Sequence, residues 1–329
     1  MRRLVLVVVV VVVALGGCSF SKSDGVSRDA PPGDRDGPGL DAPDVTTPDA
    51  PDLDAPPGPT CLEKWAAGTV ALGQATKLAA ISSSSTDRDP FVTADGLELF
   101  FFSDRAGSQG SDVYVATRAA PNGAFANPQR RADISSSGDD GKTSMTGNQL
   151  IAVVSSNRPG SQGGSFDLYM AKRPDKNAQF GAFDRLLTSA LNDNTSQFDP
   201  TLSADGLRLY YAFGSPQRIV MASRQTVNDP FGATLTDIIS TPAGNADPAF
   251  TPDEKVIIFS STRAATKQGV NLWYATRATT SDPFGDPIEL AGANTNSADG
   301  DPTLSPDGCQ LFFASDRDGT HDLFVVDVL

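Results

Sequence analysis

The sequence predicts an all-β fold built from repeated four-stranded units, and three observations lead to this prediction. The chain of 329 residues is rich in turn-forming residues, with 30 Gly and 24 Pro, and has few runs of strong helix formers. One phrase recurs along residues 61 to 329, with starts about 50 to 60 residues apart. Every copy alternates short β-branched or aromatic runs with turn signals, which is typical of consecutive antiparallel strands.

The repeated phrase begins near residues 89, 139, 199, 247 and 301. Four copies open on Asp-Pro: DPFVTADGLELFFFSDRAGSQGSDVYVATR, DPTLSADGLRLYYAFGSPQRIVMASR, DPAFTPDEKVIIFSSTRAATKQGVNLWYATR and DPTLSPDGCQLFFASDRDGTHDLFVV. The copy over residues 139 to 173 lacks Asp-Pro and is the most degraded. A shorter element recurs between the copies and reads AQFGAFDRLLTS, DPFGATLTDIIS or DPFGDPIELAGA.

Each copy, with its shorter element, predicts four strands. Asp-Pro is expected to open the first strand, because proline is tolerated at a strand start. SPDG or SADG then forms a tight turn, with proline at the second position and Asp and Gly after it. Runs such as LFFFS form the second strand, the DRxG stretch turns into a third strand such as DLFVV, and the shorter element supplies the fourth. Repeated units of four antiparallel strands are the blades of a β-propeller.

The two ends of the repeat region predict how the ring closes. The last copy stops after its third strand, whereas an unattached fourth-strand element, ALGQATKLAAIS, covers residues 71 to 82. This element matches DPFGDPIELAGA in register, with Leu72 at the place of Phe284 and Gly73 at the place of Gly285. The N-terminal strand is therefore expected to complete the final blade, which gives five blades and leaves no open sheet edge.

The repeats resemble those of a known family. SPDG or SADG, an apolar run, SDR, and then DL with an aromatic residue resemble the PD40 repeats, which are WD40-like repeats of the TolB family and of many bacterial lipoproteins. The resemblance covers nearly all of residues 76 to 329 and implies a propeller in the bacterial envelope. Two copies depart from the pattern: residues 199 to 224 carry FGSPQR in place of SDR and the following Asp, and residues 139 to 173 lack Asp-Pro.

The N-terminus predicts a targeting segment. Two arginines precede an apolar run over residues 4 to 15, which suits a signal peptide and is shorter than the ~20 residues that span a bilayer. The following LGGC, residues 15 to 18, resembles the lipobox of bacterial lipoproteins, which implies cleavage after residue 17 and acylation of Cys18. By resemblance to lipoprotein sorting, Ser19 favours the outer membrane, facing the periplasm or the cell surface. The alternative is an ordinary secretory signal with an incidental cysteine.

Residues 18 to 60 are predicted to be the lipidated cysteine and a disordered Asp/Pro-rich tether. Stretches such as DAPPGDRDGPGLDAPDVTTPDAP bury too little apolar surface to offset the entropy of ordering. A Pro-rich docking motif is the weaker alternative, because no aromatic or basic anchor interrupts the segment. The expected domain plan is a signal peptide over residues 1 to 17, this tether, and a propeller over residues 61 to 329.

The other two cysteines predict a disulfide. With Cys18 acylated, Cys61 and Cys309 remain in a compartment where disulfides persist. Cys61 precedes the strand that closes the ring, and Cys309 lies in the blade that this strand completes. We expect the two to be joined, and two separate thiols are the alternative.

Composition excludes several classes of function. The net charge of −14 disfavours nucleic acid, whose phosphates require a basic footprint. A single histidine, His321, excludes histidine-based triads and histidine-rich zinc sites, and no GxSxG elbow or phosphate loop is present, so no cofactor is predicted. Asp316, Asp318 and Asp322 resemble a calcium loop. The other copies carry arginine and few acids in the same stretch, so a hairpin turn is the simpler interpretation, and no metal site is predicted.

The polar connections between blades are the predicted place of recognition, because loops on a rigid ring commonly carry binding sites. The candidate ligand face comprises Asp89, Asp140, Asn194, Asp199, Asp247, Asn296 and Asp301. The predicted function is an envelope binding or scaffolding module for a protein or a glycan, including peptidoglycan, with membrane contact through the lipid anchor only. No catalysis is expected; the alternatives are a propeller glycoside hydrolase that uses channel carboxylates and plain solvated turns without a ligand.

Overall fold

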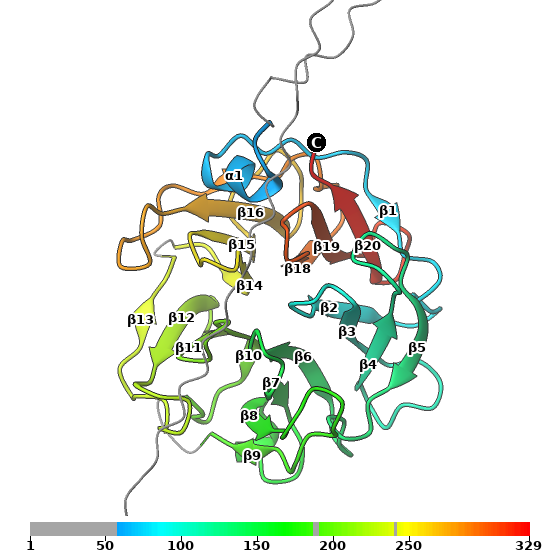
Figure 1. Cartoon of the computed structure of the whole chain (residues 1–329), viewed down its shortest axis with the longest axis vertical. Helices are drawn as coiled ribbons and strands as arrows, with labels where there is room; N and C mark the ends of the chain where they lie inside the picture. Colours follow the sequence, from blue (N-terminus) through cyan, green and yellow to red (C-terminus); the bar gives the residue numbers. More distant parts are fainter. Residues whose placement is uncertain (1–57, 187–190, 240–241) are drawn as a thin grey trace, which may run out of the picture. The chain divides into compact units, whose positions relative to one another are not determined.

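Each copy of the repeat folds as an antiparallel sheet of four strands, and five such sheets stand around a common axis (Figure 1). The structure, a computed structural model, describes residues 58–186, 191–239 and 242–329. Within this part of the chain, the five-bladed propeller expected from the repeats is confirmed. The predicted signal peptide, the lipidated Cys18 and nearly all of the predicted tether lie outside the described residues.

The strands follow the chain in blade order, apart from the first. Blade 1 contains β2 (Asp87–Val92), β3 (Glu98–Ser103), β4 (Asp112–Thr117) and β5 (Ala126–Arg130). Blade 2 contains β6 (Asp140–Met145), β7 (Ile151–Ser156), β8 (Asp167–Lys172) and β9 (Asp184–Arg185), with a 3-10 turn, η1 (Gln162–Gly164), before β8. Blade 3 contains β10 (Gln197–Leu202), β11 (Arg208–Phe213), β12 (Arg218–Ser223) and β13 (Thr236–Asp237). Blade 4 contains β14 (Asn245–Phe250), β15 (Val256–Ser261), β16 (Asn271–Thr276) and β17 (Ile288–Glu289). Blade 5 contains β18 (Asp299–Leu304), β19 (Gln310–Ser315), β20 (Asp322–Asp327) and β1 (Thr76–Lys77).

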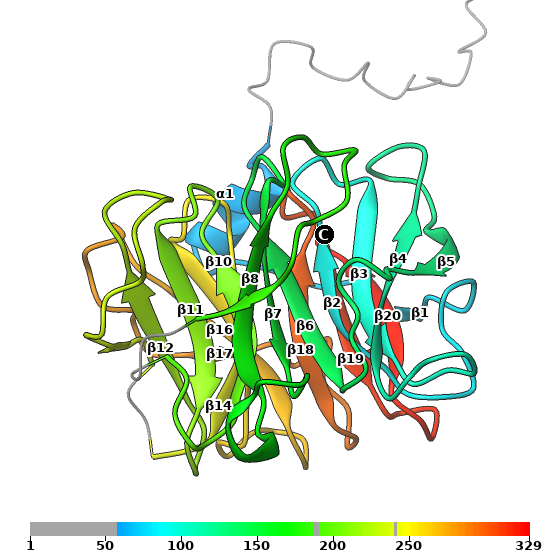
Figure 2. The ribbon, with the colours of Figure 1, turned by 90° about the horizontal axis from the view of Figure 1, so that it is seen from below.

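Neighbouring blades pack face to face, which explains why the inner strands read as nearly continuous apolar runs. The interface between blades 1 and 2 is representative, with Phe100, Val113 and Val115 packed in one cluster with Met145, Ala152 and Val154. Seen from the side, the strands run from one face of the ring to the other (Figure 2). None of the helices in the described residues has both the length and the apolar character of a membrane span.

The N-terminal strand closes the ring as predicted. Strand β1 pairs antiparallel with β20, with Thr76 opposite Val325. The equivalent strand of blade 4, β17, places Ile288 opposite Tyr274. Both pairs follow the register deduced from the sequence. The fourth strand of blade 5 therefore comes from the N-terminal part of the propeller region, and blade 5 has four strands like the other blades.

An N-terminal helix, α1 (Cys61–Ala66), was not predicted. Thr60 and Glu63 form a capping box, in which the Thr60 hydroxyl accepts from the Glu63 amide and the Glu63 carboxylate accepts from Thr60. Trp65 is fully buried and meets the ring of Tyr274 edge-on, with centroids 5.3 Å apart. Cys61 is joined to Cys309 by a disulfide, with 5.1 Å between the Cα atoms. The helix is therefore held on blades 4 and 5 by a covalent bond and by a buried aromatic anchor.

Trp65 also replaces a contact that the last blade lacks. In blades 1 to 4 an arginine at the end of the third strand donates its Nε hydrogen to a carbonyl in the turn between the first two strands; the pairs are Arg118–Gly96, Arg173–Gln149, Arg224–Gly206 and Arg277–Glu254. Blade 5 ends without such an arginine. Trp65 donates its Nε1 hydrogen to the Gly308 carbonyl at 2.9 Å, which is the equivalent acceptor.

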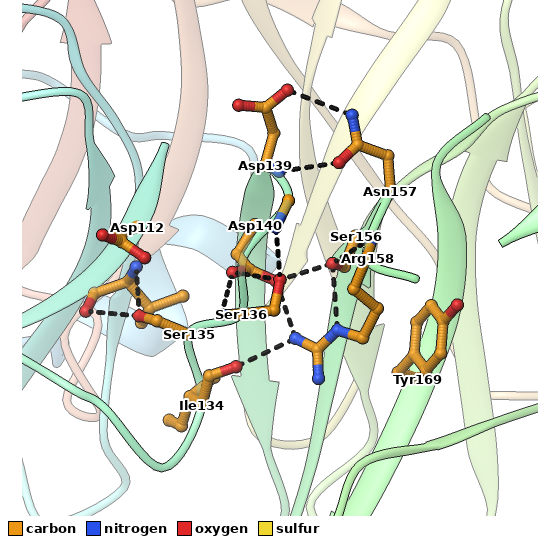
Figure 3. Close-up of polar contacts among 12 residues, drawn as sticks. Asp112, Ile134, Ser135, Ser136, Asp139, Asp140, Ser156, Asn157, Arg158 and Tyr169 are labelled. Atoms are coloured by element: carbon orange, nitrogen blue, oxygen red, sulfur yellow. Dashed lines mark hydrogen bonds and ion pairs between the residues drawn. The ribbon is translucent and has the colours of Figure 1, made fainter. Parts of the chain in front are cut away.

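The recurrent SDR or SNR motif forms an interlocking contact that we call the clasp, shown for blade 2 in Figure 3. Asp140, the first residue of β6, accepts from the Ser136 amide, the Ser156 hydroxyl and the Arg158 guanidinium, each at 2.6 Å. Arg158 also donates to the Ile134 carbonyl at 2.9 Å. The clasp thus ties the first strand, the second hairpin and the incoming connection together. The arginine of the motif has a larger role than turning a hairpin.

The ion pair of the clasp recurs in three blades, and the other two blades depart from it. Blade 1 uses Asp87, Ser103 and Arg105, and blade 5 uses Asp299, Ser315 and Arg317. In blade 4, Asn245 stands in place of the aspartate and accepts from Arg263. In blade 3, Gln197 stands there, and the β11–β12 hairpin shortens to residues 214–217 and carries no arginine of this kind.

Candidate ligand site at the channel mouth

The innermost strands bring one position of all five repeats together at the centre of the ring. This position is the aspartate of Asp-Pro, and its occupants are Asp89, Lys142, Asp199, Asp247 and Asp301. The expectation that Asp-Pro opens the first strand is wrong, because the aspartate is the third residue of the strand in all four copies. The aspartates therefore face the channel.

A β-bulge explains the true placement. In β18, Gly300 lies opposite Ala314 and Thr303 lies opposite Phe312, so Asp301 and the proline after it share a single partner position. The four aspartates have positive φ angles of 54° to 56°. Aspartate enters this left-handed region more readily than most residues, and the following proline lacks an N–H that would require a partner. The Asp-Pro pair therefore suits the bulge but is not required for it, because β6 has the same register shift between Asp140 and Thr143.

Three of the aspartates form an acidic floor, a name used below for Asp89, Asp199 and Asp247. One carboxylate oxygen from each lies within 4.8 Å of the other two, and the residues are only 6%, 8% and 7% exposed. Burial, followed by repulsion from neighbouring carboxylates, raises the pKa of Asp89 and of Asp199 well above the usual range, and the pKa of Asp247 is raised for the same reasons. The raised pKa values therefore favour either the protonated form of these carboxyl groups or a cation bound beside them.

The fourth aspartate has a partner of its own. Asp301 forms a two-bond ion pair with Arg88, at 2.9 and 3.3 Å. Burial acts to raise the pKa of Asp301, but the adjacent guanidinium outweighs it and brings the pKa to about 2. Lys142, at the fifth position, is buried and donates to the Pro248 carbonyl at 3.2 Å. Both basic side chains therefore have their direct partners outside the acidic floor, although their charges still lower the pKa of Asp89.

A cavity of about 380 Å³ opens above the acidic floor. Its walls include Phe102, Phe166 and Phe198, all half-buried, and the Phe166 and Phe198 rings have centroids 5.3 Å apart. Its rim includes Gln217 in the short hairpin of blade 3 and Thr262 in blade 4. The lining comes from blades 1 to 4, because Arg88 extends to Asp301 on the side of blade 5.

The connections between blades and the second hairpins lie together around this cavity. The Thr86 amide donates to Asp104 at 2.7 Å, and the Ala298 amide donates to Asp316 at 2.8 Å. In blade 2 the Asp139 amide donates to the Asn157 side chain at 2.6 Å, as Figure 3 shows. The loop face is therefore held by hydrogen bonds between these two sets of segments.

A second cavity of about 230 Å³ lies at the other end of the channel. Lys142 lines it, together with Phe91, Phe250 and Tyr210. Only the larger cavity has the acidic floor among its lining residues. The central ring of side chains thus separates an acidic mouth from a more apolar one that contains a lysine.

The seven predicted ligand residues fall into four groups. The structure brings Asp89, Asp199 and Asp247 together in the acidic floor, and Asp301 lies beside them under Arg88. Asp140 lines the same cavity, but its carboxylate accepts the three donors of the clasp. Two residues, Asn194 and Asn296, are exposed on the connections and do not line the cavity.

Sequence reasoning missed other residues of the site, Arg88, Lys142 and Phe198 among them. The signal for Lys142 was present, since it stands where every other copy has the Asp of Asp-Pro. Among the acids considered for calcium, Asp322 forms a salt bridge of 2.5 Å with Lys77, Asp316 accepts from a backbone amide, and Asp318 is exposed. The oxygens that lie close enough to share a cation are instead those of the acidic floor.

Fold and channel together define a five-bladed β-propeller with a ligand-sized cavity at one mouth. Among solved structures, the chain is similar to TolB from Acinetobacter baumannii, with 13% identity and a TM-score of 0.50 over 76% of this chain and 55% of TolB. It therefore spans little more than half the length of that protein. It is also similar to a thermostable family-43 glycoside hydrolase (15% identity, TM-score 0.52, 77% of this chain and 92% of the hydrolase).

A third similar structure is the Bacillus subtilis arabinanase Arb43A, with 13% identity and a TM-score of 0.50 over 75% of this chain and 96% of the arabinanase. At these identities the similarities establish the shared fold. No protein-family model matches the sequence, and no curated protein matches it. Binding proteins and hydrolases share this architecture, so function has to be argued from the site.

Proposed function

We propose that this chain is a lipid-anchored envelope protein whose propeller binds a ligand in the cavity above the acidic floor, without catalysing a reaction. The observation that carries the proposal is the cavity itself, which combines a floor of buried acids, aromatic walls and a polar rim on a rigid ring. Such convergent polar groups in a cavity of this size are typical of binding sites. A protein or a glycan of the envelope is the expected ligand.

The point where the chain enters the propeller supports this arrangement. Helix α1 contacts Gly308 in the turn between β18 and β19, and this turn lies at the strand ends opposite the cavity mouth. Figure 2 shows α1 toward one face of the ring. Helix α1 therefore lies on the face of the propeller opposite the cavity mouth.

A glycoside hydrolase is the second candidate, and the raised pKa values of the acidic floor are the observation in its favour, because a general acid needs a raised pKa. A hydrolase also needs an ionised carboxylate that reaches the substrate. The aspartate with a lowered pKa, Asp301, is 1% exposed, paired with Arg88 and absent from the cavity lining. The geometry therefore favours binding over hydrolysis.

A crosslinking experiment tests the proposal. A photoreactive amino acid at position 217, on the rim of the cavity, is compared with one at position 253, exposed in a turn on the opposite face, in the full-length protein exposed to envelope extract and to a glycan array. A ligand captured from position 217 and not from position 253 is expected. In a parallel glycosidase screen, turnover that disappears in Asp199→Asn would overturn the binding function in favour of hydrolysis.

A further inference from the structure

In the part of the chain that the structure describes, Arg88 and Lys142 act on the acidic floor through their charge but form no ion pair with it. In the described residues, no salt bridge reaches Asp89, Asp199 or Asp247. Asp247 accepts from the Ser260 hydroxyl and from the Asp301 amide. No hydrogen bond to the Asp89 carboxylate is found within residues 58–186, 191–239 and 242–329, although the residue is 94% buried and lines the cavity. The Asp89 carboxyl group therefore has room for a donor that enters from the cavity.

On this basis we infer that the ligand of the proposed binding site presents a primary ammonium group on an apolar stem, as a lysine side chain does, and that this group is bound by the acidic floor. The inference rests on the proposed function and specifies its chemistry. An ammonium carries three N–H donors, and the floor offers one carboxylate from each of three blades within 4.8 Å of one another. Charge-assisted hydrogen bonds of this kind offset the desolvation of the ammonium.

The walls above the floor match the rest of such a group. Phe102, Phe166 and Phe198 present aromatic surface to the cavity, and aromatic faces attract cations and pack against methylene groups. A calcium ion, by contrast, takes six to eight oxygen ligands. The floor supplies three carboxylates beside apolar walls, which suits an alkylammonium better.

Binding should release protons. Because burial and mutual repulsion raise the pKa of Asp89 and Asp199, an incoming cation displaces protons, so its affinity increases over the range of pH above the usual aspartate pKa. The charged groups that face the floor from the surrounding strands are Arg88 on β2, Lys142 on β6, Asp247 on β14 and Asp301 on β18. Arg88 stays protonated throughout this range, and Asp301, whose pKa is about 2, stays ionised.

The test is calorimetric titration of the purified full-length protein. The probes are lysine with both termini blocked, its quaternary trimethyl form, its neutral Nε-acetyl form, and calcium chloride alone. The primary amine is expected to bind at least tenfold more tightly than the other two lysine forms. Equal binding of the quaternary or acetylated form, or saturable calcium binding that the primary amine does not displace, would overturn the inference. Hexylamine and a lysine-containing peptide distinguish a small amine from a protein segment as the source.

Matched variants locate the site. Asp89→Asn and Asp199→Asn are expected to weaken binding of the primary amine at least tenfold, whereas Asp318→Asn, which removes a charge from an exposed hairpin on the same face, should change it less than twofold. Asparagine also tolerates the left-handed backbone of these two positions. If a variant fails to fold, the comparison among lysine forms on the parent protein still decides the question. A ligand crosslinked at position 217 with unchanged affinity in Asp89→Asn would refute the ammonium inference alone.

Discussion

Blades 5 and 3 both depart from the repeat, but only one of the two departures is compensated. Blade 5 lacks a fourth strand of its own and the arginine that closes the first turn, and the N-terminus supplies β1 and Trp65 in their place. Blade 3 lacks the clasp, and the Gln197 side-chain amide donates to Asp193 and Thr195 of its own connection. In blade 5 the missing strand and the missing contact are both replaced, whereas in blade 3 the missing clasp is not.

The blade without the clasp borders the candidate site. The shortened hairpin of blade 3 contributes Gln217 to the rim of the cavity, and Phe198 of the same blade contributes a wall. Blade 5 contributes no lining residue. The reinforced blade thus secures the ring, and the relaxed blade borders the candidate site, as expected if recognition is built on the less constrained part of a rigid scaffold.

The largest effect is expected from the disulfide that secures blade 5. Cys61 and Cys309 are 248 residues apart, so the bond constrains almost the whole propeller in the unfolded state. In the chain-entropy model, a loop of this length contributes about 5 kcal/mol to stability. The double variant Cys61→Ser/Cys309→Ser should lose stability of this order in urea unfolding under non-reducing conditions. Reductant should shift the parent and leave the variant unchanged; a shift of both would contradict the assignment.

The next prediction compares the stability that the clasp position contributes in blade 5 and in blade 3. Asp299→Ala removes the buried acceptor of the blade 5 clasp and leaves Arg317 without its partner, which should cost about 4 kcal/mol. Gln197→Ala, at the same position of blade 3, removes a neutral side chain with local bonds and should cost about 1 kcal/mol. Urea unfolding of both variants checks the difference. Equal losses would mean that the clasp adds nothing beyond a local hydrogen bond.

The sequence predicted the ring, its closure and its register because these depend on short-range patterns. Turn signals, apolar runs and the match of residues 71 to 82 to the fourth-strand element are all visible within one repeat or between two. The site was only half predicted. Four of its aspartates were named, but Asp-Pro was placed at a strand start, whereas the backbone bulge that turns each aspartate toward the channel appears only once the strands are paired.

Helix α1 was missed for a related reason. Its six residues are too few to show an apolar period, and a helix of this length gains its stability from packing. Trp65 and the disulfide supply that packing at a site more than 240 residues away in the sequence. Arg88 was missed because its partner, Asp301, lies 213 residues away and comes beside it only through ring closure.

A third prediction concerns pH and the acidic floor, which only blades 1, 3 and 4 build. The folded-state pKa of Asp199 is raised by burial and then by Asp247 and Asp89, so its protonated form is favoured in the folded protein. The associated stability is fully present below the unfolded pKa, near 3.8, and is lost as the pH rises toward the folded value. Asp199→Asn removes this loss, so the variant should be more stable than the parent at pH 8.

Urea unfolding of the parent and of Asp199→Asn at pH 5 and pH 8 checks this result. The stability difference between the two proteins should be larger at pH 8 than at pH 5. Asp318→Asn serves as the control, because this exposed side chain on the hairpin of blade 5 should leave the pH dependence of the parent unchanged. A parent that gains stability between pH 5 and pH 8 relative to Asp199→Asn would mean that the floor carries no excess of buried negative charge.

The smallest predicted effect tests which contact holds helix α1 against blade 5. Thr60→Ala removes the N-cap of α1 and should cost about 1 kcal/mol in urea unfolding. The informative measurement is the same change in the Cys61→Ser/Cys309→Ser background. We expect Trp65 to hold the helix without the disulfide, through its burial and its bond to Gly308. Thr60→Ala should then cause the same loss of stability in both backgrounds. A cap that contributes nothing once the disulfide is absent would show that the helix detaches, and that the cross-link, rather than the tryptophan, compensates the incomplete blade.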